Sequence, residues 1–163
     1  AIKEGYDVKV SEVHGMSQRG GSVVTYVKYG DKVYSPIIDR GEADLILAFE
    51  MLEAMRALPY LKKGGKMIAN TQKMNPMPVI TGAMEYPENI EEKLSAKINL
   101  QAVDALSLAE KAGTIKAVNV VLIGLLAKSM DVDKNVWIDV IKETVPEKFL
   151  DVNIKAFELG YEL

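Results

Sequence analysis

Apolar and polar positions along the chain follow two periods, and together they predict an alternating order of strands and helices. Segments rich in β-branched, aromatic and aliphatic side chains predict strands at residues 7–13, 22–29, 32–35, 43–49, 66–69 and 98–103. Gly30 and Asp31 separate the second and third segments, so we expect those two strands to form a hairpin. The run at 43–49 is apolar apart from Asp44, which is typical of a strand covered on both faces in a parallel sheet.

Helices are predicted where apolar residues recur every three or four positions: at residues 50–58, 89–97, 105–112, 116–130 and 133–144, and again beyond Pro146. Pro59 ends the first helix, Gly113 follows the third, and Asp133 is a candidate N-cap. The stripe of the last helix is expected to consist of Phe149, Val152, Ala156 and Leu159. Residues 62–65 are expected to form a turn, and residues 74–78, with two prolines, to be irregular.

This order of elements predicts an α/β fold. We expect a three-layer, Rossmann-like sheet with helices on both faces and a helical C-terminal third. Residues 1–4 resemble the end of a helix that leads through Gly5 into a strand. A doubly wound domain ordinarily opens with a strand and a glycine-rich turn. We therefore expect one domain over residues 1–163 that lacks this opening strand and turn.

Composition narrows the class of protein. The 163 residues are 48% hydrophobic and 26% charged, as in a globular domain with a sizeable core. A net charge of −3 speaks against general binding of nucleic acid, and no apolar segment approaches the ~20 residues that span a bilayer. The chain has no cysteine and one histidine, so it holds no cysteine-ligated cluster or multi-histidine metal site. Residues 1–6 do not have the apolar segment and cleavage pattern of a signal peptide, and we expect a cytoplasmic protein.

The loop at residues 14–22 (HGMSQRGGS) joins two predicted strands and is the segment of the chain best suited to bind a ligand. Its glycines allow the backbone to approach a ligand, and consecutive amides form anion-binding nests. Arg19 is able to bind a phosphate or carboxylate in a bidentate manner. The amides of Gly20 and Gly21 are further candidate anion contacts, with neutral hydrogen bonds from Gln18 and Ser22. The alternative is a surface connection whose glycines serve only to turn the chain.

For each of the other candidate site residues, a purely structural role is an alternative to a functional one. His14 is a candidate acid–base group, although a lone histidine is more often a hydrogen-bonded structural residue. Glu50 follows a strand and precedes a helix, where it is either a functional carboxylate or a helix cap. Asn70 and Thr71 occupy the same place after the next strand, as ligand contacts or turn residues. The methionines Met67, Met74, Met77 and Met84 form either an adaptable contact surface or part of the core.

Several segments resemble a known family. Residues 11–23 (SEVHGMSQRGGSV) are similar to the loop of the small, beta subunit of indolepyruvate:ferredoxin oxidoreductase. This subunit belongs to the gamma/catalytic domain family of the pyruvate and 2-oxoacid:ferredoxin oxidoreductases. The resemblance continues through residues 34–38 (YSPII), 41–44 (GEAD), 48–50 (AFE), 145–149 (VPEKF) and 153–160 (NIKAFELG), so it covers essentially the whole chain.

The resemblance implies a reaction and a division of labour. An aryl-2-oxoacid such as indolepyruvate is decarboxylated on thiamine diphosphate, the acyl fragment passes to coenzyme A, and electrons leave through iron–sulfur clusters to ferredoxin. Thiamine diphosphate and the clusters are expected on a large alpha subunit. This chain is expected to form a hetero-oligomer with that subunit and to be inactive without it. Arg19, with the amides of Gly20 and Gly21, is then expected to contact an anion of coenzyme A or the oxoacid at the interface. Gln18, His14 and Ser22 would orient that anion.

Three alternatives stay open on the sequence. The chain is a gamma subunit of a pyruvate or other 2-oxoacid:ferredoxin oxidoreductase, a stand-alone anion- or nucleotide-binding module, or a purely structural oligomerisation subunit. The missing glycine turn counts against the stand-alone module, as does the lack of a ribose-binding acidic residue after such a turn.

Overall fold

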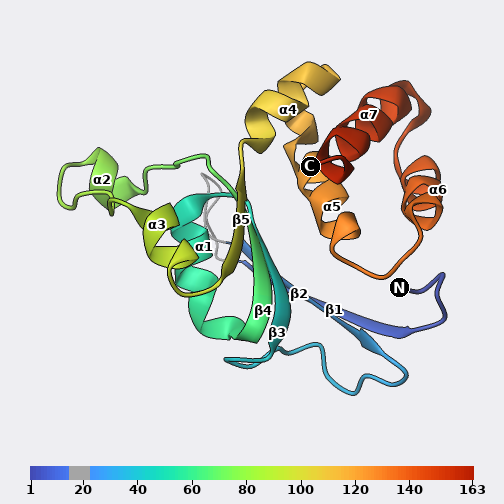
Figure 1. Cartoon of the computed structure of the whole chain (residues 1–163), viewed down its shortest axis with the longest axis horizontal. Helices are drawn as coiled ribbons and strands as arrows, with labels where there is room; N and C mark the ends of the chain where they lie inside the picture. The colour runs from blue at the N-terminus through green and yellow to red at the C-terminus, as the bar shows by residue number, and fades with distance from the viewer. Residues whose placement is uncertain (15–22) are drawn as a thin grey trace.

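A parallel sheet forms the middle of a three-layer α/β arrangement in the computed structural model, which describes residues 1–14 and 23–163 (Figure 1). The strands β3 (Ala43–Ala48), β4 (Leu61–Asn70) and β5 (Asn99–Val103) lie side by side in sequence order. Helices cover both faces, as the alternation of apolar segments predicts. The Rossmann-like fold class is therefore confirmed.

The strand β4 is longer than predicted because the expected turn at 62–65 is a bulge inside it. Ala43 pairs with Leu61 and Leu45 pairs with Lys66, so four residues of β4 stand opposite Asp44 alone. Gly65 makes this bulge possible, since a Cβ at that position would lie 2.8 Å from Leu61 Cδ1 and 2.9 Å from the carbonyl oxygen of Asp44. The bulge lies at the edge of the sheet where β4 begins.

The first two strands form an antiparallel ribbon. The strand β1 (Asp7–His14) pairs with β2 (Val23–Gly30) over all eight positions of each strand, from Asp7 opposite Gly30 to His14 opposite Val23. The hairpin predicted between residues 22–29 and 32–35 is wrong, because residues 32–35 are not a strand. The carboxylate of Asp7 instead accepts a hydrogen bond from the Val33 amide (2.9 Å) and fixes this segment against the start of β1.

One face of the sheet is covered by α1 (Met51–Ala57), η1 (Leu58–Tyr60) and α3 (Ile90–Ser95). The core on this side contains Met51, Leu52 and Ala54 from α1, Met67 and Ala69 from β4, and Ile90 and Leu94 from α3. Met67 is therefore a core residue, as one of the two interpretations of the methionines predicts. The short helix α2 (Met77–Ile80) lies outside both cores.

The opposite face carries the helical C-terminal third. It consists of α4 (Ala105–Ala112), η2 (Ile115–Ala117), α5 (Val118–Lys128), α6 (Lys134–Thr144), η3 (Glu147–Phe149) and α7 (Leu150–Tyr161). The nearly all-apolar helix α5 lies at the centre of the core on this side, together with Ile68 and Phe157. Asp133 caps α6 by accepting a hydrogen bond from the Asn135 amide (2.7 Å), and Gly113 follows α4, both as predicted.

The helices α5 and α7 pack at unusually close range. A Cβ at Gly160 would lie 1.9 Å from the carbonyl oxygen of Val121, and one at Gly124 would lie 2.1 Å from that of Phe157. The two glycines therefore let the helix backbones touch, and Phe157 fills the core beside them. The predicted stripe is right for Ala156, which is buried, and for Val152 and Leu159, which pack against the core, and it is wrong for Phe149, which is 49% exposed.

Candidate functional site

The side chain of Asn70 links the segments that follow the three parallel strands, at the carboxyl ends of these strands. Its side chain is fully buried, and its Nδ2 donates to the carbonyl oxygen of Phe49 (3.2 Å) and to Oε1 of Gln72 (3.3 Å). Its Oδ1 accepts a hydrogen bond from the amide of Ala105 (3.1 Å). One amide side chain thus connects the residue after β3, the end of β4 and the first residue of α4 beyond β5. This is the edge at which open α/β sheets bind their ligands.

Glu50 is the buried cap of α1. Its Oε2 accepts from the Leu52 amide (3.0 Å) and its Oε1 from the Glu53 amide (2.6 Å), and the residue is 6% exposed. A carboxylate in this place satisfies free amides at the positive end of the helix. Of the two roles predicted for Glu50, these contacts are those of a helix cap.

Tyr86 is the member of this cluster that sequence analysis missed. Its hydroxyl donates to Oε2 of Glu50 (3.2 Å), and the ammonium of Lys73 lies 5.9 Å from the centre of its ring. Burial, with the negative charge of Glu50 beside it, raises the pKa of Tyr86 to about 12. The two partners are 36 positions apart in the sequence, and no spacing pattern predicts their contact.

Thr71 contributes its backbone to the same edge. Its amide donates to the carbonyl oxygen of Val103 (2.9 Å), and the carbonyl oxygen of the next residue, Gln72, accepts from the Met51 amide (3.3 Å). The structure thus brings together the three secondary candidates, Glu50, Asn70 and Thr71. Their contacts are with backbone groups and neighbouring side chains, so together they make a rigid edge around the ends of the strands.

The loop that carries the primary candidates joins β1 to β2. Gln18, Arg19, Gly20, Gly21 and Ser22 lie outside the described residues, and only the backbone of His14 is described, opposite Val23.

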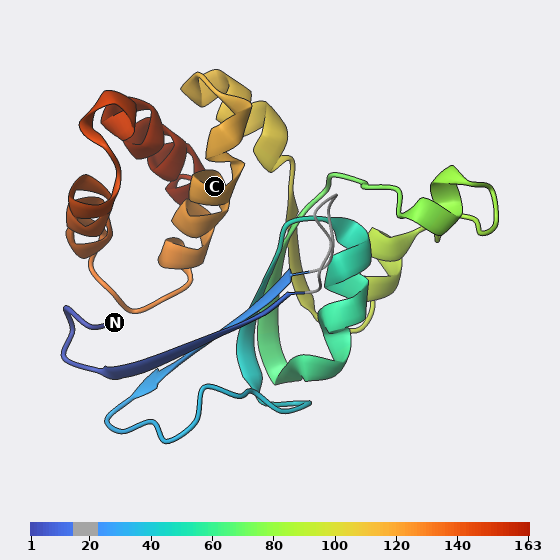
Figure 2. The ribbon, with the colours of Figure 1, turned by 180° about the vertical axis from the view of Figure 1, so that it is seen from behind.

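The ribbon that ends in this loop is held against the body of the protein through β2. The rings of Tyr26 and Tyr60 lie 6.3 Å apart, and burial with the neighbouring Tyr60 raises the pKa of Tyr26. In both views the end of the ribbon where β1 ends and β2 begins lies on the side of the molecule that carries α1 (Figures 1 and 2).

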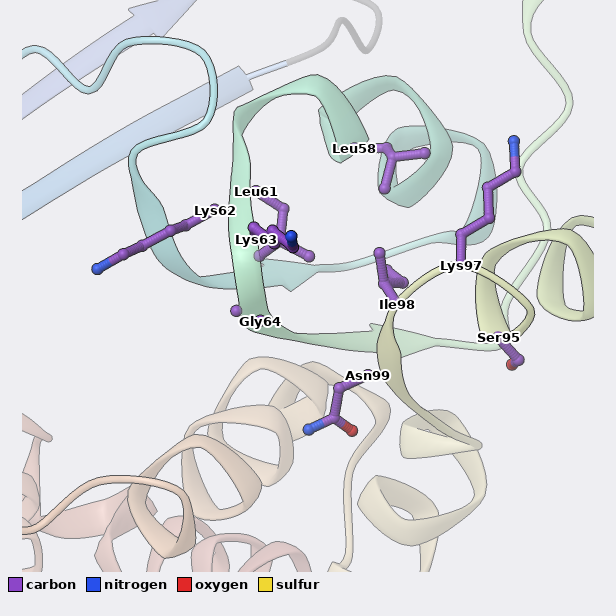
Figure 3. Close-up of a pocket in the computed structure, with 10 residues that line it drawn as sticks. Leu58, Leu61, Lys62, Lys63, Gly64, Ser95, Lys97, Ile98 and Asn99 are labelled. Carbon is purple, nitrogen blue, oxygen red and sulfur yellow. The ribbon is translucent and has the colours of Figure 1, made fainter.

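A separate cavity lies at the opposite edge of the sheet, beside the bulge of β4. It has a volume of about 390 Å³ and is lined by three lysines, Lys62, Lys63 and Lys97, together with residues at the start of β5. Lys62 forms an ion pair with Asp44 (2.9 Å), which raises the pKa of its ammonium. Figure 3 shows the three lysine side chains pointing in different directions, so they do not converge on one anion.

Neither a metal site nor a membrane span is found in the described part of the chain. Among residues 1–14 and 23–163, no group of three or more histidine, cysteine, aspartate or glutamate side chains is placed to hold a metal ion. No helix among these residues is both long and apolar enough to cross a bilayer.

Comparison with known proteins identifies the family. The profile described as "Pyruvate ferredoxin/flavodoxin oxidoreductase" matches residues 1–163. The chain belongs to this family. It is 45% identical to the indolepyruvate oxidoreductase subunit IorB of Pyrococcus horikoshii, over 98% of this chain and 82% of that protein. The IorB subunit of Thermococcus kodakarensis is 44% identical, with the same coverage.

A solved structure agrees on the fold. The gamma subunit of a keto/oxoacid ferredoxin oxidoreductase from Geobacter sulfurreducens superposes with a TM-score of 0.69 at 23% identity. The match covers 99% of this chain and 82% of that subunit. The resemblance seen in residues 11–23 and in the C-terminal segments is thus confirmed, and the chain is similar to small subunits of oxidoreductase complexes over its whole length.

Proposed function

We propose that this chain is the small subunit of an aryl-2-oxoacid:ferredoxin oxidoreductase that acts on indolepyruvate or a related arylpyruvate. In this role it supports the oxidative decarboxylation of the oxoacid to an acyl-coenzyme A, coupled to the reduction of ferredoxin. The observation that carries the proposal is the 44–45% identity to indolepyruvate oxidoreductase subunits over 98% of the chain. Sequence similarity at this level, without a large unmatched region in this chain, favours the same subunit role.

The proposal assigns the cofactors to a large alpha subunit. The sequence contains no cysteine, so this chain has no thiolates with which to hold an iron–sulfur cluster. Thiamine diphosphate, when bound to the large subunit, supplies the carbanion chemistry of decarboxylation. What is left for this chain is to bind the large subunit and to shape the entrance for the oxoacid and coenzyme A.

Two features of the chain suit that task. The buried contacts of Asn70 and the Glu50–Tyr86 pair hold the carboxyl edge of the sheet in one arrangement. Sites supported by rigid elements position ligands more accurately than free loops do. The loop between β1 and β2 supplies the chemistry: Arg19 binds a phosphate of coenzyme A or the carboxylate of the oxoacid, assisted by the amides of Gly20 and Gly21. Gln18, His14 and Ser22 orient the bound anion.

Steady-state kinetics of the assembled complex test this role for the loop. Arg19→Ala is expected to raise the KM for coenzyme A or for the oxoacid by roughly 10- to 100-fold, as expected for loss of a charge-assisted hydrogen bond to an anion. Arg40→Ala is the matched control, because Arg40 is an exposed arginine outside the loop. Unchanged constants for Arg19→Ala in an intact complex would refute the role of the loop while leaving the subunit assignment in place.

A further inference from the structure

An uncharged, apolar arm extends from the carboxyl edge of the sheet. It consists of residues 74–84 (MNPMPVITGAM), which include α2 (Met77–Ile80). In Figures 1 and 2 this green segment projects from the sheet and the helices that cover it. None of its residues belongs to either apolar core. The arm is thus outside the packing that stabilises the domain.

The side chains of the arm are unusual for a solvent-exposed segment. Its eleven residues include no charged side chain, whereas 26% of the whole chain is charged. Four large apolar side chains are more than half exposed: Met74 at 59%, Met77 at 66%, Ile80 at 64% and Met84 at 64%. A group of exposed apolar side chains within one short segment is typical of a site that contacts another molecule.

The arm has an internal structure that prepares it for binding. The amide of Met84 donates to the carbonyl oxygen of Pro78 (3.0 Å), and the amide of Thr81 donates to that of Met77 (2.9 Å). The Thr81 hydroxyl also donates to the carbonyl oxygen of Pro78 (3.2 Å). Pro76 and Pro78 restrict the backbone further. A segment held in one shape before binding loses less conformational entropy when it binds.

Both ends of the arm are fastened to the candidate site. Before it, Gln72 accepts a hydrogen bond from Asn70 through its side chain and another from the Met51 amide through its backbone. After it, Tyr86 donates to Glu50. A protein that binds the arm is therefore brought to the carboxyl edge of the sheet.

We propose that the arm inserts into an uncharged, apolar recess on the large subunit and anchors that subunit over the carboxyl edge. This inference rests on the proposed function, because it takes the large subunit as the partner. The absence of lysine and arginine in the arm argues against an anionic membrane surface, which attracts basic segments. The cavity beside β4 carries three lysines and does not match an uncharged arm from a second copy of this chain. Methionine side chains adapt to an irregular apolar surface, as such a recess requires.

The test measures binding of the full chain to the tagged large subunit of the same complex. The double variant Met77→Glu/Ile80→Glu places two charges on the arm without removing a core residue. We expect its dissociation constant to rise at least about 100-fold, which corresponds to about 2.8 kcal/mol. Ile115→Glu is the matched control, because Ile115 is 58% exposed on η2 in the other helical layer, and its affinity is expected to stay within about threefold of the unsubstituted chain. Amides of residues 79–84 are also expected to gain protection from hydrogen exchange on assembly.

Each outcome bears on a different claim. Tight binding by the double variant, or equal losses in the double variant and the control, overturns the inference and leaves the subunit assignment intact. A chain that fails to bind the large subunit at all rejects the proposed function, and the docking inference with it. Self-association of the chain alone that the double variant abolishes would assign the arm to a second copy and overturn the large subunit as its partner.

Discussion

Asn70→Asp tests whether the carboxyl edge of the sheet depends on the donor groups of one buried amide. The substitution exchanges an NH₂ for an oxygen and changes the side-chain volume very little. The bond from the Ala105 amide can survive, because a carboxylate also accepts. An ionised carboxylate can make neither of the two donations, to the Phe49 carbonyl oxygen and to the Gln72 side chain, and it would face both oxygens at 3.2 and 3.3 Å.

The size of the effect follows from hydrogen bonding and from ionisation. A neutral carboxyl has one O–H donor where the amide has two N–H donors, so at least one of the two donations is lost, which costs about 1–3 kcal/mol. Burial and the facing oxygens raise the pKa of the introduced carboxyl in the folded state above about 3.9, its value in the unfolded chain. Protonating such a group at pH 7 adds at most about 4 kcal/mol, since each pH unit above 3.9 costs about 1.4 kcal/mol. Together the two contributions reach at most about 7 kcal/mol at pH 7, which is a large fraction of the 5–15 kcal/mol by which folded proteins are ordinarily stable.

Urea denaturation followed by circular dichroism provides the measurement, with the unsubstituted chain and the variant compared at pH 4.5 and at pH 7. Because the folded pKa is raised, the variant is least affected near or below pH 3.9 and loses stability as the pH rises through its folded value. Asn75→Asp, at an exposed position, serves as the control and is expected to change stability by less than about 0.5 kcal/mol. A loss below about 1 kcal/mol at pH 7, with no dependence on pH, would refute the account of Asn70.

Two further substitutions test other contacts. Gly160→Ala is expected to destabilise the domain by about 3 kcal/mol in thermal or urea unfolding, because the new Cβ would meet the Val121 carbonyl oxygen and force α5 and α7 apart. Gly30→Ala, which has open space around it, is its control, and equal stabilities would contradict the close packing. Tyr86→Phe is expected to cost about 1–2 kcal/mol at pH 8, through loss of the bond to Glu50. Since the pKa of Tyr86 is raised to about 12, this contribution is complete below pH ~10 and is lost as the pH rises through about 12, and an ultraviolet titration without a late-titrating tyrosine would contradict it.

Local patterns in the sequence predicted most elements of the fold. The apolar run at Ala43–Ala48 indicates a strand covered on both faces, and the structure places helices on both sides of β3. The ends of helices were also predictable, because Asp133 and Gly113 act through contacts with their own neighbours. The secondary candidates Glu50, Asn70 and Thr71 follow from the rule that parallel strands end at a common edge.

Contacts between residues far apart in the sequence could not be predicted from local patterns. Residues 22–29 could pair with either neighbouring segment, and the eight-residue register with β1 prevailed over the short turn at Gly30 and Asp31. The contact of Tyr86 with Glu50 also depends on the tertiary path of the chain. Phe157 enters the core beside the glycine contact between α5 and α7, whereas Phe149 lies before α7, at the end of η3, and stays exposed.

Ferredoxin reduction by the reconstituted complex tests the central claim most directly. The large subunit, loaded with thiamine diphosphate and its clusters, would be assayed with indolepyruvate and coenzyme A, with and without this chain, and with pyruvate in place of indolepyruvate. The proposed function predicts rapid reduction of ferredoxin that requires this chain and favours indolepyruvate. A rate that is the same without the chain, or a complex that prefers pyruvate, would contradict it.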